Sequence, residues 1–305
     1  MRVTPILLAI GFALGSEAAA PAAPLRVCAT TPDLGSLCAE IGGAAVDVMV
    51  FAKPGDDPHF IDAKPSFIRE LNRADVFIQT GLELEIGWAP LLLQGARNPR
   101  LTQGQPGFID AARAITPMDL PTGPLDRSHG DIHPGGNPHY LLDPRQGLSV
   151  ARLICSSLSA LRPEETAGFA DRLADFERRL FAMNERWDAQ MASHRGTRVV
   201  VDHNLWVYFA DRFGLRIAAQ LEPKPGVPPT TRHLRDVIEQ MQAEQVPVIV
   251  SSPYFDERHA QFVATHTGAR VARLAHQPGS RPETGDYLGM IDYNVRTLAT
   301  ALRGP

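Results

Sequence analysis

The stretch PEETAGFADRLADFERRLFAMNERWDAQMASH, residues 163–194, lies near the middle of a chain of 305 residues. Apolar side chains recur in it at three- and four-residue steps, the period of one helix face: Phe169, Leu173, Phe176, Leu180, Met183 and Trp187. We predict one long helix, within residues 161–194, that connects two lobes. Because a continuous helix has no obvious place for large backbone rotations, we expect less opening between the lobes than flexible linkers would allow.

Strand-like and helical segments alternate on both sides of this helix. In residues 21–160, strand-like segments at 26–31, 45–52, 75–81 and 107–111 alternate with helical segments at 34–41, 65–72 and 85–94. In residues 195–305, strand-like segments at 197–203, 215–220, 246–252 and 269–274 alternate with helical segments at 206–213, 231–243, 257–267 and 287–302. The apolar, unalternating strands are typical of parallel sheets covered on both faces. The sequence predicts an α/β fold with two lobes, each a mainly parallel sheet flanked by helices.

Composition limits the classes of partner. A length of 305 residues agrees with two domains rather than one. Hydrophobic residues make up 44% of the chain and charged residues 21%, with a net charge of −4 and no long basic run. This balance gives no electrostatic basis for binding nucleic acid or an anionic membrane. We expect a monomer with well-formed apolar cores.

The N-terminus predicts export. Residues 1–20 contain Arg2, an apolar run at 6–14 and a small-residue end at 18–20, which together are typical of a cleaved signal peptide. The apolar run has about ten residues, and a membrane-spanning helix needs roughly twenty. We therefore expect the mature chain to be free in the periplasm, without membrane insertion.

The three cysteines leave two interpretations open in that oxidising compartment. Cys28 lies in a strand-like segment, Cys38 in the following helix, and Cys155 on the apolar face of residues 151–161. One disulfide with one thiol left over would fit a periplasmic protein. Three buried free thiols would fit equally well.

Four short segments carry side chains that can bind a metal ion: GDDPHF at 55–60, NPHY at 137–140, VVVDHN at 199–204 and GDYLGM at 285–290. They contribute His59, His139, His203 and Asp286, and three imidazoles with one carboxylate suit tetrahedral Zn²⁺. His203 ends a buried strand, where α/β proteins usually bind ligands, and Asp286 precedes the last helix as a candidate cap. If these four meet, the metal lies between the lobes.

Residues 116–137 form one long irregular segment, rich in Pro and Gly, that contains His129, Asp131 and His133. Such segments are usually functional or disordered. This one is either an auxiliary site that captures metal and passes it inward, or a solvated loop. Five other histidines are predicted to lie at the surface: His194, His233, His259, His266 and His276. Glu83, Glu85 and Asp143 are the candidates for orienting the metal-binding imidazoles.

Segments along nearly all of the mature chain resemble the periplasmic solute-binding proteins of metal ABC transporters, which bind zinc or manganese. The resemblance rests on residues 30–43, 54–85, 137–144, 203–215, 221–241 and 285–295, in the order that the family has them. It implies metal ligands at His59, His139, His203 and Asp286, and delivery of the metal to an inner-membrane permease, with a periplasmic metallochaperone as a further partner. Leu141 departs from the tryptophan that is usual in the family at this position.

The ligand set also bears on the choice of metal. Manganese-binding members of the family often carry Glu at the third position, where this chain has His203, and neutral imidazoles favour Zn²⁺ over Mn²⁺. We predict a zinc-binding transport protein, with a manganese-binding member as the alternative. A zinc hydrolase would need water in the fourth place, and the chain has no HExxH motif. A metal buffer or adhesin without a transporter would share the same site.

Overall fold

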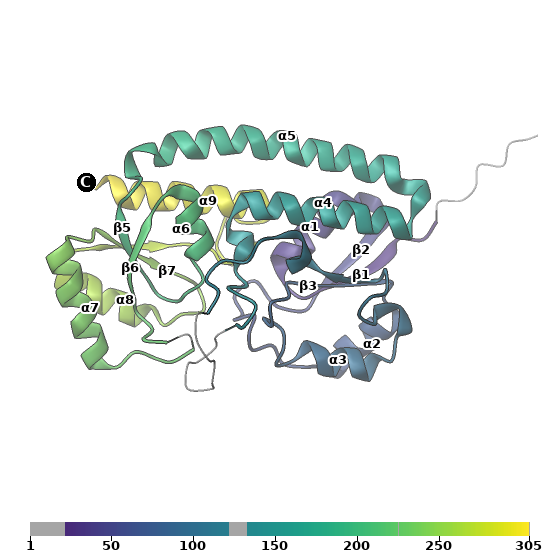
Figure 1. Cartoon of the computed structure of the whole chain (residues 1–305), viewed down its shortest axis with the longest axis horizontal. Helices are drawn as coiled ribbons and strands as arrows, with labels where there is room; N and C mark the ends of the chain where they lie inside the picture. The colour runs from purple at the N-terminus through teal and green to yellow at the C-terminus, as the bar shows by residue number, and fades with distance from the viewer. Residues whose placement is uncertain (1–21, 122–132, 225, 305) are drawn as a thin grey trace, which may run out of the picture.

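The structure is a computed structural model that describes residues 22–121, 133–224 and 226–304. The predicted signal peptide, His129 and Asp131 lie outside the described residues. Two α/β lobes lie side by side, and the long helix α5 (Thr166–Met191) runs across both of them (Figure 1). The predicted fold class is confirmed.

Each lobe contains one four-stranded parallel sheet. The first has the order β2-β1-β3-β4 and consists of β1 (Leu25–Ala29), β2 (Val46–Val50), β3 (Val76–Gln79) and β4 (Phe108–Asp110). The second has the order β6-β5-β7-β8 and consists of β5 (Arg198–Val201), β6 (Arg216–Gln220), β7 (Val248–Ser251) and β8 (Arg270–Arg273). In both sheets the strand order reverses beside the first strand, and ligands of open α/β sheets bind at the carboxyl ends of the strands near such a point.

The helices cover both faces of the sheets. Besides α5 they are α1 (Pro32–Gly42), α2 (Pro65–Arg73), α3 (Ala89–Ala96), α4 (Pro144–Leu161), α6 (Val207–Phe213), α7 (Thr231–Glu244), α8 (Glu257–Thr267) and α9 (Tyr287–Arg303). Short 3₁₀ turns are η1 (Gly43–Ala45), η2 (Pro99–Leu101), η3 (Ala111–Ala114), η5 (Tyr140–Leu142), η6 (Pro163–Glu165) and η7 (Ala192–His194). In the described part of the chain, the helices fall short of the length and apolar character that crossing a membrane requires.

The helix α3 begins later than the sequence predicts. We expected a helix from residue 85, but residues 81–88 form turns in which Leu82 and Glu83 have positive φ angles of 52° and 66°. The buried carboxylate of Glu85 accepts hydrogen bonds from Thr30 Oγ1 and from the backbone N–H of Thr80. These contacts join the ends of β1 and β3, so Glu85 supports the sheet edge instead of starting a helix.

The two lobes share one apolar core along α5. Its buried side chains include Phe169, Phe176, Leu180 and Trp187, in agreement with the predicted helix face. The helix packs against α1 and α4 of the first lobe and against α9, and the indole of Trp187 donates to Asp292 at 2.9 Å. A single buried cluster includes strands of both sheets. The lobes are therefore packed together and not merely tethered.

Tyr287, at the start of α9, fastens this final helix to the first lobe. Its ring lies against Gly147 of α4, where a Cβ atom would come within 2.1 Å of the phenol oxygen. The hydroxyl donates to Leu141 O at 2.8 Å, and the backbone N–H donates to the Ser36 hydroxyl oxygen at 3.0 Å. Only glycine at position 147 leaves room for this ring.

All three cysteines are buried and free. The interpretation with one disulfide is wrong, and the alternative of three buried thiols holds in this structure. Burial raises the pKa of Cys28 and of Cys38 to about 12, so both thiols stay protonated at neutral pH. Protonated, buried thiols are poor metal ligands.

Candidate metal centre

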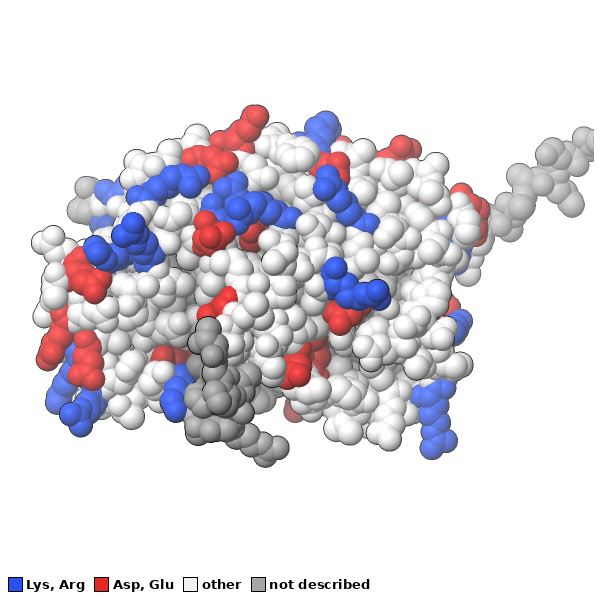
Figure 2. Space-filling model, viewed as in Figure 1, with Lys and Arg blue, Asp and Glu red and all other residues white. Residues whose placement is uncertain are grey.

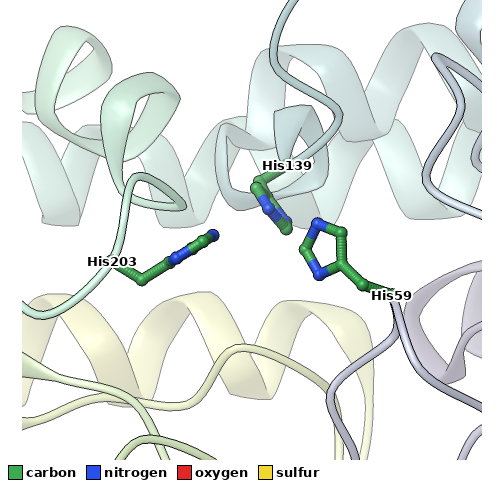
Figure 3. A group of neighbouring side chains, drawn as sticks. All are labelled: His59, His139 and His203. Carbon is green, nitrogen blue, oxygen red and sulfur yellow. The ribbon is translucent and has the colours of Figure 1, made fainter. Parts of the chain in front are cut away.

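Three histidines from distant parts of the sequence converge between the lobes (Figure 3). One ring nitrogen each of His59, His139 and His203 lies within 4.8 Å of the other two. The ring centroids are separated by 5.2 Å for His59 and His139, 5.8 Å for His59 and His203, and 5.7 Å for His139 and His203. The rings point toward one another from separate segments, so each nitrogen can face a common ion.

His59 comes from the turn that follows β2. The Asp57 carboxylate accepts the backbone N–H of His59 at 3.0 Å and lies 2.7 Å from His59 Nδ1. The indole of Trp88 donates to Pro58 O at 3.0 Å. These contacts hold the turn and direct the opposite edge of the imidazole into the site.

His139 precedes the 3₁₀ turn η5 and helix α4. Asn137 Oδ1 accepts the backbone N–H of His139 at 3.0 Å, and Asn137 Nδ2 donates to Asn204 O, next to His203. The Tyr208 hydroxyl donates to Asn137 O at 2.9 Å. One asparagine therefore ties the His139 turn to the His203 turn, across the boundary between the lobes.

His203 follows β5 and is almost fully buried, with 5% of its surface exposed. The preceding Asp202 accepts the backbone N–H of His203 at 2.7 Å and the indole N–H of Trp206 at 3.1 Å. On the other side of the ring, Glu222 Oε2 lies 2.6 Å from His203 Nδ1. Asp202 therefore holds the backbone of His203, and Glu222 holds its imidazole ring.

The surroundings shift the pKa values of His139 and His203 in opposite directions. Burial lowers the pKa of His139 well below 6.5, and the neighbouring His59 and His203 lower it further. Burial also lowers the pKa of His203, but the hydrogen bond and negative charge of Glu222 outweigh this effect and leave the pKa above 6.5. His139 is therefore neutral at neutral pH, the form that binds a metal.

His133 lies beside the three histidines. Its Nε2 is 3.2 Å from His59 Nε2, and their ring centroids are 5.2 Å apart. In tetrahedral zinc sites with Zn–N distances of about 2.0–2.1 Å, two ligating nitrogens lie about 3.3–3.4 Å apart. Burial and the nearby His59 lower the pKa of His133 to about 4. A pocket of about 260 Å³ is lined by His133, His139 and His203, so this loop histidine belongs to the wall of the site.

Asp286 lies outside the group of three histidines. Its side chain is exposed, and Oδ1 accepts the backbone N–H of Gly289 at 2.7 Å as the N-cap of α9. It lines a different hollow, beside Pro32 and Glu40. The predicted capping role is confirmed, and this role turns the carboxylate toward its own helix instead of the histidines.

The prediction that His276 lies at the surface is wrong. The side chain is 5% exposed, and its Nε2 is 3.0 Å from Asp56 O. Its Nδ1 is buried without a hydrogen-bond partner among the described residues. His276 and His139 line one small cavity together with Tyr254. Its position three residues after β8, at the same sheet edge as His203, is the signal that could have identified it.

Two carboxylates touch the site, and neither is among those expected to orient the imidazoles. Glu85 supports the sheet edge, Asp143 caps α4 by accepting the Arg145 backbone N–H, and Glu83 is exposed. The carboxylates that contact the histidines are Asp57 and Glu222. A sequence signal existed for Asp57, which precedes His59 by two residues. Glu222 follows β6, and it comes near His203 through the pairing of β6 with β5.

Comparison with known proteins agrees with this architecture. The family profile described as "Zinc-uptake complex component A periplasmic" (ZnuA) matches residues 27–301. The high-affinity zinc uptake system protein ZnuA of Paracoccus denitrificans is 24% identical, covering 98% of this chain and 99% of that protein. The manganese ABC transporter substrate-binding lipoprotein PsaA of Streptococcus mitis is 20% identical, covering 97% of this chain and 95% of that protein.

A solved structure shows the same fold. The crystal structure of ZnuA superimposes with a TM-score of 0.75 at 21% sequence identity, covering 91% of this chain and 98% of that chain. Together with the match over residues 27–301, this confirms the resemblance found in the sequence. The chain belongs to the ZnuA family of periplasmic metal-binding, solute-binding proteins.

Proposed function

We propose that this protein binds Zn²⁺ in the periplasm and delivers it to an inner-membrane ABC permease. The observation that carries the proposal is a set of three nitrogen donors, His59, His139 and His203, which no carboxylate of the described residues joins. Imidazole suits Zn²⁺, whereas Mn²⁺ lies lowest in the divalent affinity order and favours oxygen ligands. The name of the Paracoccus denitrificans relative points to zinc, and that of the Streptococcus mitis relative to manganese.

The fourth coordination position in this proposal belongs to His133. Its Nε2 lies 3.2 Å from His59 Nε2, close to the separation of two nitrogens on one tetrahedral ion. A ligand that comes from the loop at the wall of the pocket can arrive last and leave first. His276 is the second candidate for this place, because its Nδ1 is buried and has no partner among the described residues.

Metal preference tests the proposal directly. We expect Zn²⁺ to displace Mn²⁺ completely at equal free concentrations, because nitrogen donors bind zinc more tightly. Replacing His203 with glutamate supplies oxygen donors at the same place. The His203→Glu variant is therefore expected to have a smaller ratio of Zn²⁺ affinity to Mn²⁺ affinity than the wild type. Competition titrations with a chromophoric chelator measure both affinities. A wild-type protein that prefers Mn²⁺ would favour the manganese-binding alternative.

Delivery to a permease is tested separately from metal binding. We expect the zinc-loaded protein, and not the metal-free protein, to bind an inner-membrane metal permease in detergent or in a lipid bilayer. Solute-binding proteins are not a class of enzymes, so zinc-dependent turnover of an ester or a peptide should be absent. Such turnover, abolished by His203→Ala, would contradict the transport function and support a hydrolase.

Zinc affinity is expected to depend on pH through His203. The pKa of His203 is raised above 6.5. A proton therefore competes with the metal for His203 once the pH falls through this raised pKa. Above it the affinity should be constant, and below it the affinity should fall by about tenfold for each pH unit and each competing proton. His139 and His133 have lowered pKa values and compete only in acid. Unchanged affinity from pH 8 to about pH 5 would contradict ligation by His203.

A further inference from the structure

We propose that Asp57 and Glu222 are positioning residues that fix the tautomer of one metal-binding imidazole in each lobe. This inference rests on the proposed function and names the groups that prepare the site for the ion. Asp57 lies in the first lobe with His59, and Glu222 lies in the second lobe with His203. Each carboxylate faces Nδ1 of its histidine, at 2.7 Å and 2.6 Å respectively.

The hydrogen-bonding chemistry determines which nitrogen is free. An ionised carboxylate can only accept hydrogen bonds, so Nδ1 of each imidazole must carry the proton. The lone pair is then on Nε2, which points away from the carboxylate. For His59, Nε2 lies 3.2 Å from His133 Nε2, so the nitrogen that carries the lone pair faces the proposed fourth ligand. Both imidazoles therefore present Nε2 to the ion before it arrives.

The two carboxylates are themselves held in place. The Asp57 side chain also accepts the backbone N–H of His59 at 3.0 Å, which fixes its distance from the ring. Glu222 Oε2 also accepts the backbone N–H of Gly226 at 3.1 Å, and the side chain of Glu222 is 11% exposed. A carboxylate with a second, backbone partner has little freedom to rotate away. Neither needs to enter the coordination sphere to act.

The arrangement also supplies charge where the ligands supply none. Three neutral imidazoles leave the charge of a divalent cation uncompensated in a buried site. One carboxylate behind His59 and one behind His203 provide two negative charges close to the ion. The remaining histidine, His139, donates its backbone N–H to Asn137, and its ring has no carboxylate as a hydrogen-bond partner among the described residues. The two lobes thus contribute one carboxylate–imidazole pair each.

Conservative variants separate charge from shape. Asp57→Asn and Glu222→Gln keep an oxygen that can accept from Nδ1, but they remove the charge and introduce a competing N–H donor. We expect zinc affinity to fall about 10–100-fold in each variant, the usual effect of removing such a partner. Glu83→Gln is the matched control, because Glu83 is exposed and lies outside the histidine group. This control should bind zinc with wild-type affinity.

Nitrogen NMR of the metal-free protein provides a readout that does not depend on zinc. Long-range ¹H–¹⁵N spectra should show the Nδ1–H tautomer for His59 and His203 in the wild type. Asp57→Asn should change only His59, and Glu222→Gln should change only His203. An Nε2–H tautomer in the wild type, or wild-type zinc affinity in both variants, would overturn the positioning role. Failure of the wild type to bind zinc would instead contradict the proposed function and leave the tautomer result standing.

Discussion

Replacing His59, His139 or His203 with alanine is expected to weaken zinc binding by about 10²-fold or more. Structural zinc sites have apparent binding free energies of about 10–16 kcal/mol, so one of four ligands accounts for roughly 3 kcal/mol. The nitrogens of these three residues lie within 4.8 Å of one another. Water can occupy a vacated position but cannot restore an imidazole nitrogen. Chelator competition at neutral pH measures each loss.

The same titration ranks the residues around the three histidines. We expect His133→Ala to weaken zinc binding less than alanine at any of the three histidines does. His133 lies on a loop at the pocket wall and is only partly buried. Asp286→Ser is the matched control: serine keeps the cap of α9 while the carboxylate is removed. It should leave affinity unchanged. If Asp286→Ser loses as much zinc affinity as His139→Ala, Asp286 is a ligand after all. If His276→Ala loses much zinc affinity and His133→Ala loses none, the fourth ligand is His276.

Gly147→Ala is expected to destabilise the whole protein by about 3 kcal/mol or more. The new Cβ would lie 2.1 Å from the Tyr287 oxygen and 2.4 Å from Cζ. The ring is fully packed and cannot move without breaking its hydrogen bond to Leu141 O. Overpacking of this kind costs typically 1–3 kcal/mol, and a buried hydroxyl left without its partner costs roughly 1–3 kcal/mol more.

Thermal unfolding measures this effect. A loss of about 3 kcal/mol corresponds to a fall in Tm of roughly 5 °C for a protein of this size. Gly168→Ala is the matched control, since Gly168 lies in α5 and its nearest neighbour is the end of the flexible Arg172 side chain at 3.3 Å. Alanine there should stabilise the helix by up to about 1 kcal/mol. Equal Tm values for both variants would mean that Tyr287 does not fasten the lobes together.

Most of the fold was predictable because its strongest signals are local. The apolar face of residues 163–194 has the helix period throughout, and the structure forms α5 there. The strands were recognisable because parallel strands buried on both faces leave apolar runs without alternation. The start of α3 was not predictable, because Glu85 is held by Thr30 and Thr80, partners that only the folded sheet brings together.

The convergence of three histidines follows from topology, and the place of Asp286 does not. His203 lies two residues after the end of β5, so the sheet itself places it at the carboxyl edge. Asp286 is separated from β8 by a twelve-residue connection, Leu274–Gly285 by sequence, whose path is set by contacts distant in the chain. His276, near the start of that connection, is the residue that the sheet edge brings close. Its place three residues after β8 is the sequence signal that distinguishes it from Asp286.

The outer carboxylates show a further limit of sequence reasoning. Asp57 is two residues from His59, so its contact is local and could have been expected. Glu222 reaches His203 only because β6 pairs with β5 in parallel register. Pairing of two strands decides which acidic side chain faces an imidazole, and a single sequence gives that pairing no direct signal.

Anomalous diffraction at the zinc absorption edge, from crystals of the zinc-loaded protein, tests the central claim most directly. The account predicts one strong peak between the lobes, at about 2.0–2.1 Å from one nitrogen each of His59, His139 and His203. It also predicts no zinc within bonding distance of Asp286. A peak bound to Asp286, or a peak away from the three histidines, would contradict the account.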